Sequence, residues 1–264
     1  GVGLHGLEAP SEALYTGNSG TTTRLLCGIL AGQPFTVTMS GDPSIQKRPM
    51  GRVMKPLREM GASIEGKNDN FCPLTLFPSE LHGIEYRLPV ASAQLKSAIL
   101  LAGLYAEGQT TVIEPAPSRD HTERMFRALG VEIETNGSTI TLDPPEDLHA
   151  VDIAVPGDIS SAAFFLVAGA IVPGSELTIK NVGVNPTRTG VLDVLRDMGA
   201  DITESNFRDE AEPMCDLTVK YSKLHGVEIG GAIIPRLIDE LPVIAVAAAF
   251  AEGETVIRDA QELK

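Results

Sequence analysis

Cysteine is scarce in this chain, and histidine pairs with metal-binding spacing are absent. Only three cysteines occur among 264 residues, namely Cys27, Cys72 and Cys215. Their odd number and wide spacing argue against a disulfide framework or a zinc site. They favour a reducing compartment, so we expect a cytoplasmic protein. The five histidines form no HxxxH or HxH pair, and we therefore expect no metal site.

Long apolar segments and positive charge are also missing. The longest apolar runs, such as 243–251, are too short and too rich in alanine to span a membrane. The opening residues GVGLHGLEAP have neither the basic segment nor the apolar core of a signal peptide. Lysine and arginine number 21 against 35 acidic residues, which gives a net charge of −14. This balance disfavours nucleic acids and anionic membranes as partners.

A sequence motif typical of a helix end followed by a strand occurs three times. Its copies are LREMGASIE, RALGVEIE and LRDMGADITE, and their glycines Gly61, Gly130 and Gly199 are 69 residues apart. An alanine-rich helix, a glycine turn and a β-branched strand precede each copy, and a fourth such segment covers 247–260. The sequence therefore predicts an α/β fold of repeated βαβαββ units. We expect the chain to begin inside one unit and to stop inside another.

The segment 15–49 has the composition of an anion socket. It contains TGNSGTTTRLL, in which Gly17 and Gly20 precede a hydroxyl-rich helix start with Arg24 one turn further on. Glycines allow a close approach of backbone N–H groups, and a helix start leaves those groups unpaired. Lys47 and Arg48 follow in a proline-bounded loop. These features predict a site for a small anion that carries phosphate and carboxylate groups. The alternative is a capped helix with a solvated Lys–Arg pair. The GxxxxGK[ST] spacing of a P-loop is absent.

Two later helix starts are further candidates. Ser92 opens a helix after the strand YRLPV, either as a phosphate cradle or as an ordinary N-cap, and the residues alone favour the cap. Lys96 on the same helix is typical of a solvated face. Arg119 could bind a phosphate in a fork-like contact, while we expect His121 to cap or pack. Asp158 is typical of a helix cap.

Five motifs in this order carry a family resemblance: GNSGTTTRLL, SIQKRPM, ASAQLKSA, SRDHTERM and PGDISSAAFFL. Together they resemble bacterial enolpyruvyl-shikimate-phosphate synthases over essentially the whole chain. The resemblance implies a two-domain enolpyruvyl-transferase architecture, an inside-out α/β barrel with three βαβαββ units per domain. It implies that this chain is incomplete at both termini. Residues 1–155 would be the latter part of the first domain, and 156–264 the first part of the second.

The resemblance also implies an activity. Such enzymes transfer the enolpyruvyl group of phosphoenolpyruvate to the 5-hydroxyl of shikimate 3-phosphate and release phosphate. The reaction belongs to the shikimate pathway, which leads to chorismate and the aromatic amino acids, and the enzyme is the target of glyphosate. It implies no metal and no organic cofactor, small molecules as the only partners, and a monomeric parent enzyme. Because other site residues would lie outside this chain, we expect it to be inactive alone.

The family motifs assign roles to individual residues. The matching residues for shikimate 3-phosphate are Ser92, Ala93, Gln94, Arg119 and Asp239. Those for phosphoenolpyruvate are Asn18, Gly20, Thr21, Arg48 and Gln94. Asp239 precedes an apolar helix and is implied to be the catalytic general base, with partial burial that would raise its proton affinity. Ala93 replaces the serine of some family members, which removes one hydroxyl contact. Gly20 implies a glyphosate-sensitive parent enzyme, because a larger residue there crowds the herbicide.

Two alternatives remain. The sister enzyme UDP-N-acetylglucosamine enolpyruvyl transferase uses a cysteine in the loop before its Arg–Pro pair. No cysteine lies between Gly41 and Pro49, which argues against that enzyme. The chain could also be a non-catalytic anion-binding α/β repeat module. The discriminating feature is whether Arg48 and Arg119 share a cleft.

Overall fold

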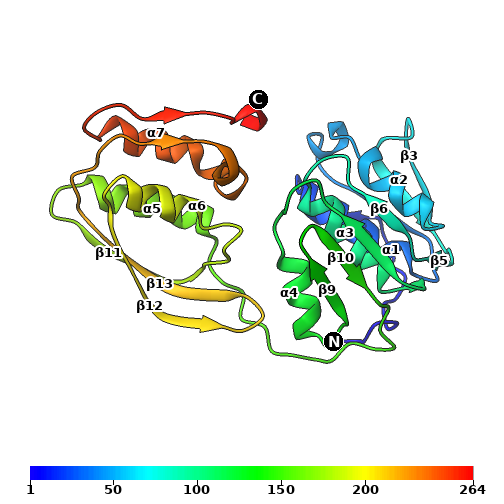
Figure 1. Ribbon diagram of the computed structural model, residues 1–264. Helices are drawn as coiled ribbons and strands as arrows, with labels where there is room; N and C mark the ends of the chain where they lie inside the picture. The colour runs from blue at the N-terminus through cyan, green and yellow to red at the C-terminus, as the bar shows by residue number, and fades with distance from the viewer. Residues whose placement is uncertain (264) are drawn as a thin grey trace. The chain divides into compact units, whose positions relative to one another are not determined.

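The computed structural model describes residues 1–263 and divides the chain into two compact units, Gly1–Val151 and Asp152–Lys264 (Figure 1). The division falls close to the boundary expected at 155/156. Lys264, the last residue of the expected second domain, lies outside the described residues. Each unit has its own cluster of buried apolar side chains.

The first unit contains two consecutive copies of the repeat. The first copy consists of β1 (Leu14–Tyr15), α1 (Gly20–Ala31), β2 (Val37–Ser40), the 3-10 turn η1 (Ile45–Lys47), α2 (Gly51–Glu59), β3 (Ser63–Lys67) and β4 (Phe71–Phe77). Its sheet has the order β1-β2-β4-β3, in which β1 and β2 are parallel and the other pairs antiparallel.

The second copy keeps this topology. It consists of β5 (Leu81–His82), β6 (Glu85–Arg87), α3 (Ala93–Gly103), β7 (Ala106–Glu107), β8 (Thr110–Ile113), α4 (His121–Ala128), β9 (Ile133–Asn136) and β10 (Thr139–Leu142). Its sheet order β6-β8-β10-β9 again pairs the first strand in parallel and the rest antiparallel. The predicted βαβαββ repeat is confirmed in both copies.

The second unit continues the pattern. It contains α5 (Ile159–Ile171), β11 (Glu176–Gly183), α6 (Gly190–Asp197), β12 (Asp201–Asp209), β13 (Pro213–Lys220), β14 (Glu228–Ile229), η2 (Gly231–Arg236), η3 (Ile238–Glu240), α7 (Leu241–Ala249), β15 (Val256–Ile257) and η4 (Gln261–Leu263). The order β11-β13-β12 lacks a full first strand, whose place is taken by a parallel bridge between Gly157 and Val182. In Figure 1, α5 lies next to α7, on which it packs.

The repeated glycines end helices as predicted. Gly61, Gly130 and Gly199 have φ angles of 101°, 81° and 94°, which an L-residue rarely adopts. At the first of them, the Gly61 N–H donates to the Arg58 carbonyl at 3.0 Å and the Ala62 N–H to the Leu57 carbonyl at 2.9 Å. Both other sites repeat this pair of bonds. The three helices therefore stop at equivalent points of the repeat.

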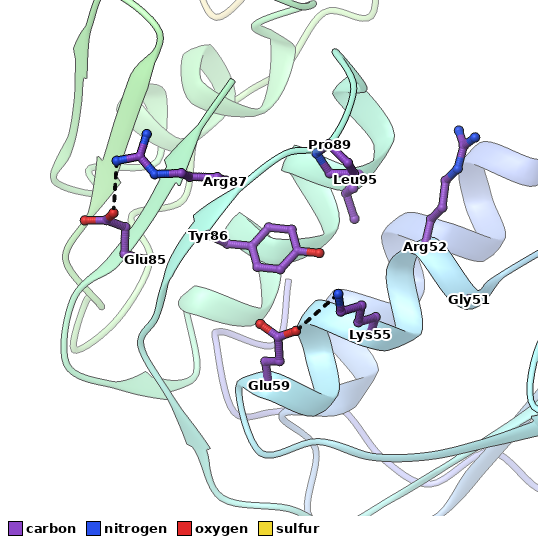
Figure 2. Close-up of a pocket in the computed structure, with 9 residues that line it drawn as sticks. All are labelled: Gly51, Arg52, Lys55, Glu59, Glu85, Tyr86, Arg87, Pro89 and Leu95. Carbon is purple, nitrogen blue, oxygen red and sulfur yellow. Dashed lines mark hydrogen bonds and ion pairs between the residues drawn. The ribbon is translucent and has the colours of Figure 1, made fainter. Parts of the chain in front are cut away.

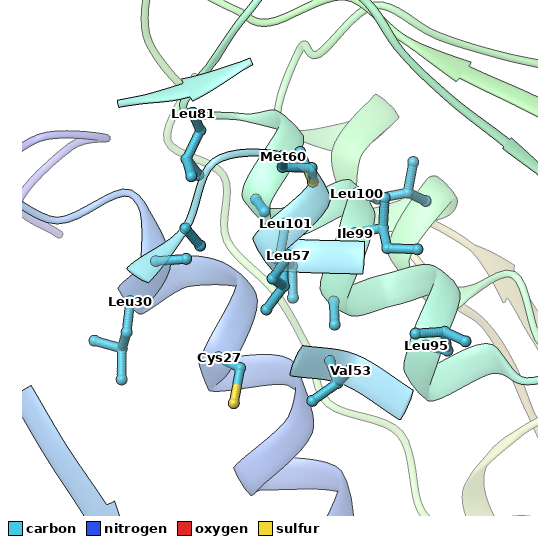
Figure 3. Close-up of a cluster of buried hydrophobic side chains, with 14 of the residues drawn as sticks. Cys27, Leu30, Val53, Leu57, Met60, Leu81, Leu95, Ile99, Leu100 and Leu101 are labelled. Carbon is cyan, nitrogen blue, oxygen red and sulfur yellow. The ribbon is translucent and has the colours of Figure 1, made fainter. Parts of the chain in front are cut away.

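The core of the first unit lies where α1, α2 and α3 meet (Figure 3). All three helices contribute side chains to this core, among them Cys27, Leu57 and Ile99, each fully buried. At the crossing of α1 and α3, Gly28 allows close backbone contact, since a Cβ there would lie 2.2 Å from the Ala98 carbonyl oxygen. None of the helices within residues 1–263 has the length and apolar character needed to cross a bilayer.

All three cysteines are free and buried, and their thiols should be inert in the folded chain. Burial raises the pKa of Cys27 to about 12, that of Cys215 to about 11, and that of Cys72 above its ordinary value. The thiolate is the reactive form, so little of it exists at about pH 8. We expect a colourimetric thiol reagent to detect no thiol at that pH until denaturant is added, and then three. A fast thiol in the native chain would contradict this burial.

Candidate functional site

The start of α1 brings two arginines together. The Ser19 hydroxyl caps the helix by accepting the Thr22 N–H at 3.0 Å. Gly20, the first helical residue, is buried, and a Cβ there would lie 3.1 Å from Arg24 Nη1 and 3.2 Å from Arg48 Nη1. Two guanidinium groups therefore cover this glycine, and a methyl group there would displace their ends.

Gln94 connects this cluster to α3. Arg24 Nη1 donates to Gln94 Oε1 at 2.6 Å, and its Nη2 donates to the Pro49 carbonyl at 3.2 Å. The Gln94 amide nitrogen donates to Thr21 Oγ1 at 2.8 Å. The hydrogen bonds on both ends of the amide fix its orientation. Arg24 therefore links three segments of the chain: α1, the loop before α2, and α3.

A cavity of about 300 Å³ opens beside these residues. It is lined by Arg24, Pro49, Arg52, Val53, Ser92, Gln94 and Leu95. Within residues 1–263, no carboxylate forms an ion pair with Arg24, Arg48 or Arg52. Burial and the positive charges of Arg48 and Arg52 lower the pKa of Arg24. Like charges gathered without a counter-charge repel one another, and a bound anion would relieve that repulsion.

Arg52 also lines a larger cavity of about 630 Å³ (Figure 2). Apart from Arg52, which lines both cavities, the charged residues of this cavity are paired within its own lining. Lys55 Nζ lies 4.0 Å from Glu59 Oε1, and Arg87 Nη2 lies 3.5 Å from Glu85 Oε1. The Tyr86 ring projects between these pairs in Figure 2. This cavity is larger, but the smaller one is lined by two uncompensated arginines, Arg24 and Arg52, and offers more to an anion.

Ser92 and Lys96 on α3 behave differently from each other. Ser92 is the N-cap and accepts the Leu95 N–H at 3.4 Å, which confirms the cap. The interpretation of Lys96 as a solvated residue was wrong, because its side chain is only 1% exposed. Its Nζ lies 3.1 Å from Glu114 Oε2 and 2.7 Å from Glu123 Oε1. The two carboxylates compensate a charge that α3 carries into the interior.

Arg119 is not among the described residues that line the smaller cavity. It is partly exposed and sits in the connection between β8 and α4. The preceding Ser118 donates its hydroxyl and its N–H to Glu114, and the following Asp120 is the N-cap residue of α4. His121 is the first residue of that helix.

The structure thus gathers most, but not all, of the expected residues. Around the smaller cavity and the two guanidinium groups lie Gly20, Thr21, Arg48, Ser92 and Gln94. Ala93 follows Ser92 as the first residue of α3 and is partly exposed. Of the described residues, neither Asn18 nor Arg119 lines this cavity. Asn18 is an exposed turn residue before α1.

Asp239 belongs to the second unit. The expectation that it is half-buried was wrong, because it is exposed on η3. The adjacent Glu240 is buried instead and accepts the Ser160 hydroxyl. Arg188 Nη2 donates to Ser160 Oγ at 2.6 Å and lies 4.0 Å from Glu240 Oε1. Glu240 therefore anchors the turn, and Asp239 faces solvent.

Asp158 caps α5 as predicted. Partial burial alone would raise its pKa, but hydrogen bonds from the Ser161 N–H and hydroxyl, together with the charge of Arg188, lower the pKa of this carboxyl overall. Its side chain accepts the Ser161 N–H at 2.9 Å, and Arg188 donates to it at 3.2 Å. The cap thus joins α5 to the residues that surround Glu240.

Arg52 was missed by the sequence analysis. It lines both cavities, and its positive charge acts on Arg24. The signal was present in the phrase QKRPMGR, where a third basic residue follows Lys47 and Arg48. Arg52 lies in the first turn of α2 and lines the same cavity as residues of α3. The sequence alone does not reveal this proximity.

Comparisons with known proteins agree on one family. The family model of EPSP synthase (3-phosphoshikimate 1-carboxyvinyltransferase) matches residues 2–264. The 3-phosphoshikimate 1-carboxyvinyltransferases of Geobacillus thermodenitrificans and Geobacillus kaustophilus are 60% and 61% identical over 266 residues. An EPSP synthase structure from Acinetobacter baumannii matches with a TM-score of 0.92 and 51% identity. All of this chain is covered in each case, but only 62% of the two Geobacillus relatives and 60% of the Acinetobacter chain.

Proposed function

Because the chain belongs to the EPSP synthase family, we propose that it is part of an enzyme that transfers the enolpyruvyl group of phosphoenolpyruvate to the 5-hydroxyl of shikimate 3-phosphate. Phosphate is released, and the reaction serves the shikimate pathway. The two small molecules are the proposed partners. The two units Gly1–Val151 and Asp152–Lys264 are the proposed latter part of the first domain and first part of the second.

The uncompensated cluster of Arg24, Arg48 and Arg52 carries this proposal. It stands out in a protein of net charge −14, and it lies beside a capped helix start and a fixed amide. Phosphoenolpyruvate bears a phosphate and a carboxylate on a small planar frame, so several guanidinium groups can bind it at once. The paired charges in the larger cavity offer no such site.

Each residue then has a physical task. Arg48 and Arg24 bind the phosphoenolpyruvate anion, and Gln94 orients it. Because Gly20 has no side chain, the guanidinium groups of Arg24 and Arg48 can lie against the start of α1, where they would bind the ligand or glyphosate. Ser92 and Arg119 bind the phosphate of shikimate 3-phosphate. Preorganised cations of this kind lower the barrier by holding two reactants together and by stabilising the departing phosphate.

Asp239 is the proposed general base for the 5-hydroxyl. Asp239 is exposed, so a substrate can reach it, whereas the neighbouring Glu240 is buried. This difference in environment supports the choice of Asp239 over its neighbour.

The proposal is tested by calorimetric titration of the chain with shikimate 3-phosphate. We expect saturable binding, and we expect Arg119→Ala to raise Kd about hundredfold, because a charge-assisted phosphate contact is worth roughly 1.5–3 kcal/mol. Arg127→Ala is the matched control. It removes an arginine from the exposed side of α4, where Arg127 bonds Thr135.

The control variant should bind like the original chain. An equal loss of binding affinity in both variants would mean that the net charge, and not a phosphate site at Arg119, causes the effect. A folded chain that shows no saturable binding would contradict the assignment of Ser92 and Arg119 to this substrate.

We further propose that the protein acts as a monomer in the cytoplasm. Its three buried thiols remain free, which fits a reducing compartment. Sedimentation of the purified protein at several concentrations tests the monomer, since a mass that rises with concentration would contradict it.

A further inference from the structure

We propose that Lys96 is a positioning residue for Arg119. Its buried ammonium group holds the connection between β8 and α4 in the conformation that presents the Arg119 guanidinium to a phosphate. This inference rests on the proposed function, in which Arg119 binds the phosphate of shikimate 3-phosphate. It assigns a task to a lysine that touches neither substrate.

The geometry places Lys96 at both ends of the connection. Glu114 directly follows β8, and Glu123 lies in the first turn of α4. Lys96 Nζ lies 3.1 Å from Glu114 Oε2 and 2.7 Å from Glu123 Oε1, and all three side chains are at most 3% exposed. One ammonium group therefore brackets residues 115–120, the segment that carries Arg119.

Glu114 transmits this constraint into the segment itself. It accepts the Ser118 N–H at 3.4 Å and the Ser118 hydroxyl through its other oxygen. Ser118 is the immediate neighbour of Arg119, and Pro115 and Pro117 stiffen the intervening backbone. The chain of contacts from Lys96 to Glu114 to Ser118 thus ends one residue from the guanidinium.

The cluster is poorly arranged for stability alone. It contains two carboxylates for one ammonium, and within the described residues the Glu123 Oε2 atom is buried without a hydrogen-bond partner. Buried ion clusters are often no more stabilising than apolar side chains of the same volume. An apolar residue at position 96 could fill the space, but it could not hold Glu114 and Glu123 at fixed points.

The same helix serves the arginine cluster. Gln94 and Lys96 are two residues apart on α3, so their side chains leave the helix in roughly opposite directions. Gln94 bonds Arg24 and Thr21 on one side, and Lys96 bonds Glu114 and Glu123 on the other. One rigid element therefore sets the position of both proposed anion contacts.

The test uses Lys96→Met alone and together with Glu123→Gln. The double variant keeps the net charge of the cluster, because it loses one positive and one negative group. Two quantities are measured on folded protein: the position of the Arg119 Nε–H resonance, identified by its absence from Arg119→Lys, and the Kd for shikimate 3-phosphate. We expect both variants to shift or broaden the Arg119 resonance and to raise Kd about tenfold or more.

Ser97→Ala is the matched control. It removes the 2.7 Å hydrogen bond between Ser97 and Thr122, which also joins α3 to α4 but lies outside the charged cluster. We expect it to lower stability and to leave the Arg119 resonance in place. If Lys96 has only a structural role, the folded double variant should instead show the original Arg119 resonance and the original Kd.

A folded double variant with an unchanged Arg119 resonance overturns the proposal. Should the double variant not fold, Glu114→Gln provides the same readout, since it keeps the size of the side chain and removes the charge that Lys96 binds. The resonance decides the positioning role without ligand. Failure of the unaltered chain to bind shikimate 3-phosphate would instead contradict the proposed function.

Discussion

Gly28→Ala should destabilise the unit Gly1–Val151 by about 3 kcal/mol or more, the upper range for overpacking a tight core. The added methyl would lie 2.2 Å from the Ala98 carbonyl oxygen and 3.0 Å from both the Ala98 carbonyl carbon and Leu101 Cβ. The nearest atoms belong to the backbone of α3, so no side-chain rotation can relieve the contact. The two helices must separate, and the core that they share with α2 must open.

The free energy of unfolding is measured in urea, with hydrogen exchange at the amides of α1 and α3 as the probe. The amides of the unit Asp152–Lys264 serve as an internal reference, because that unit has its own core. Equal protection of α1 and α3 in variant and original chains would contradict the close helix crossing.

Gly20→Ala is the matched variant on the same helix. Its methyl would meet only the ends of two arginine side chains, at 3.1 and 3.2 Å, and these can move. We expect its stability to stay within about 1 kcal/mol of the original, since alanine is favoured over glycine in a helix. The two glycines therefore separate a packing role from a site role. Gly28 is needed for the packing of α1 on α3, and Gly20 allows the two guanidinium groups to lie close to the helix start.

The parts of the fold that depend on local chemistry could be predicted from the sequence. The glycines at 61, 130 and 199 mark helix ends because a left-handed residue is needed there, and the 69-residue spacing revealed the repeat. Ser92 and Asp158 were predictable N-caps because their side-chain oxygens accept a backbone N–H that the helix start leaves unpaired. None of these inferences required knowledge of which helices touch.

The remaining features depend on contacts between distant segments. Lys96 looked solvated because a lysine on a helix normally is, but α3 is buried from Leu95 to Gly103. The bond between Arg24 and Gln94 joins residues 70 positions apart, and Arg52 gains its role only from the charges beside it. Asp239 was expected to be half-buried because an apolar helix follows it, whereas Glu240 takes the interior position.

Arg48→Ala should abolish most phosphoenolpyruvate binding and yet not destabilise the free chain. The side chain of Arg48 has no carboxylate partner within residues 1–263, and its charge lowers the pKa of Arg24. Removing it relieves a repulsion between like charges, which we expect to stabilise the free chain by a few tenths of a kcal/mol at low salt. Loss of a charge-assisted phosphate contact should raise Kd for phosphoenolpyruvate about hundredfold, measured with shikimate 3-phosphate present.

Arg58→Ala is the control, because it removes the same charge from α2 with the opposite expected effect on stability. Arg58 Nη2 lies 2.6 Å from Asp69 Oδ1 and also donates to the Ile64 carbonyl at 2.6 Å. Its loss should cost about 1 kcal/mol and leave binding unchanged. Thermal unfolding at low and high salt, together with the titration, compares the two variants. A destabilised Arg48→Ala that still bound phosphoenolpyruvate would make Arg48 a structural residue. If Arg48→Ala loses binding without losing stability, and Arg58→Ala loses stability without losing binding, then the repulsion at Arg48 is explained by its role in binding an anion.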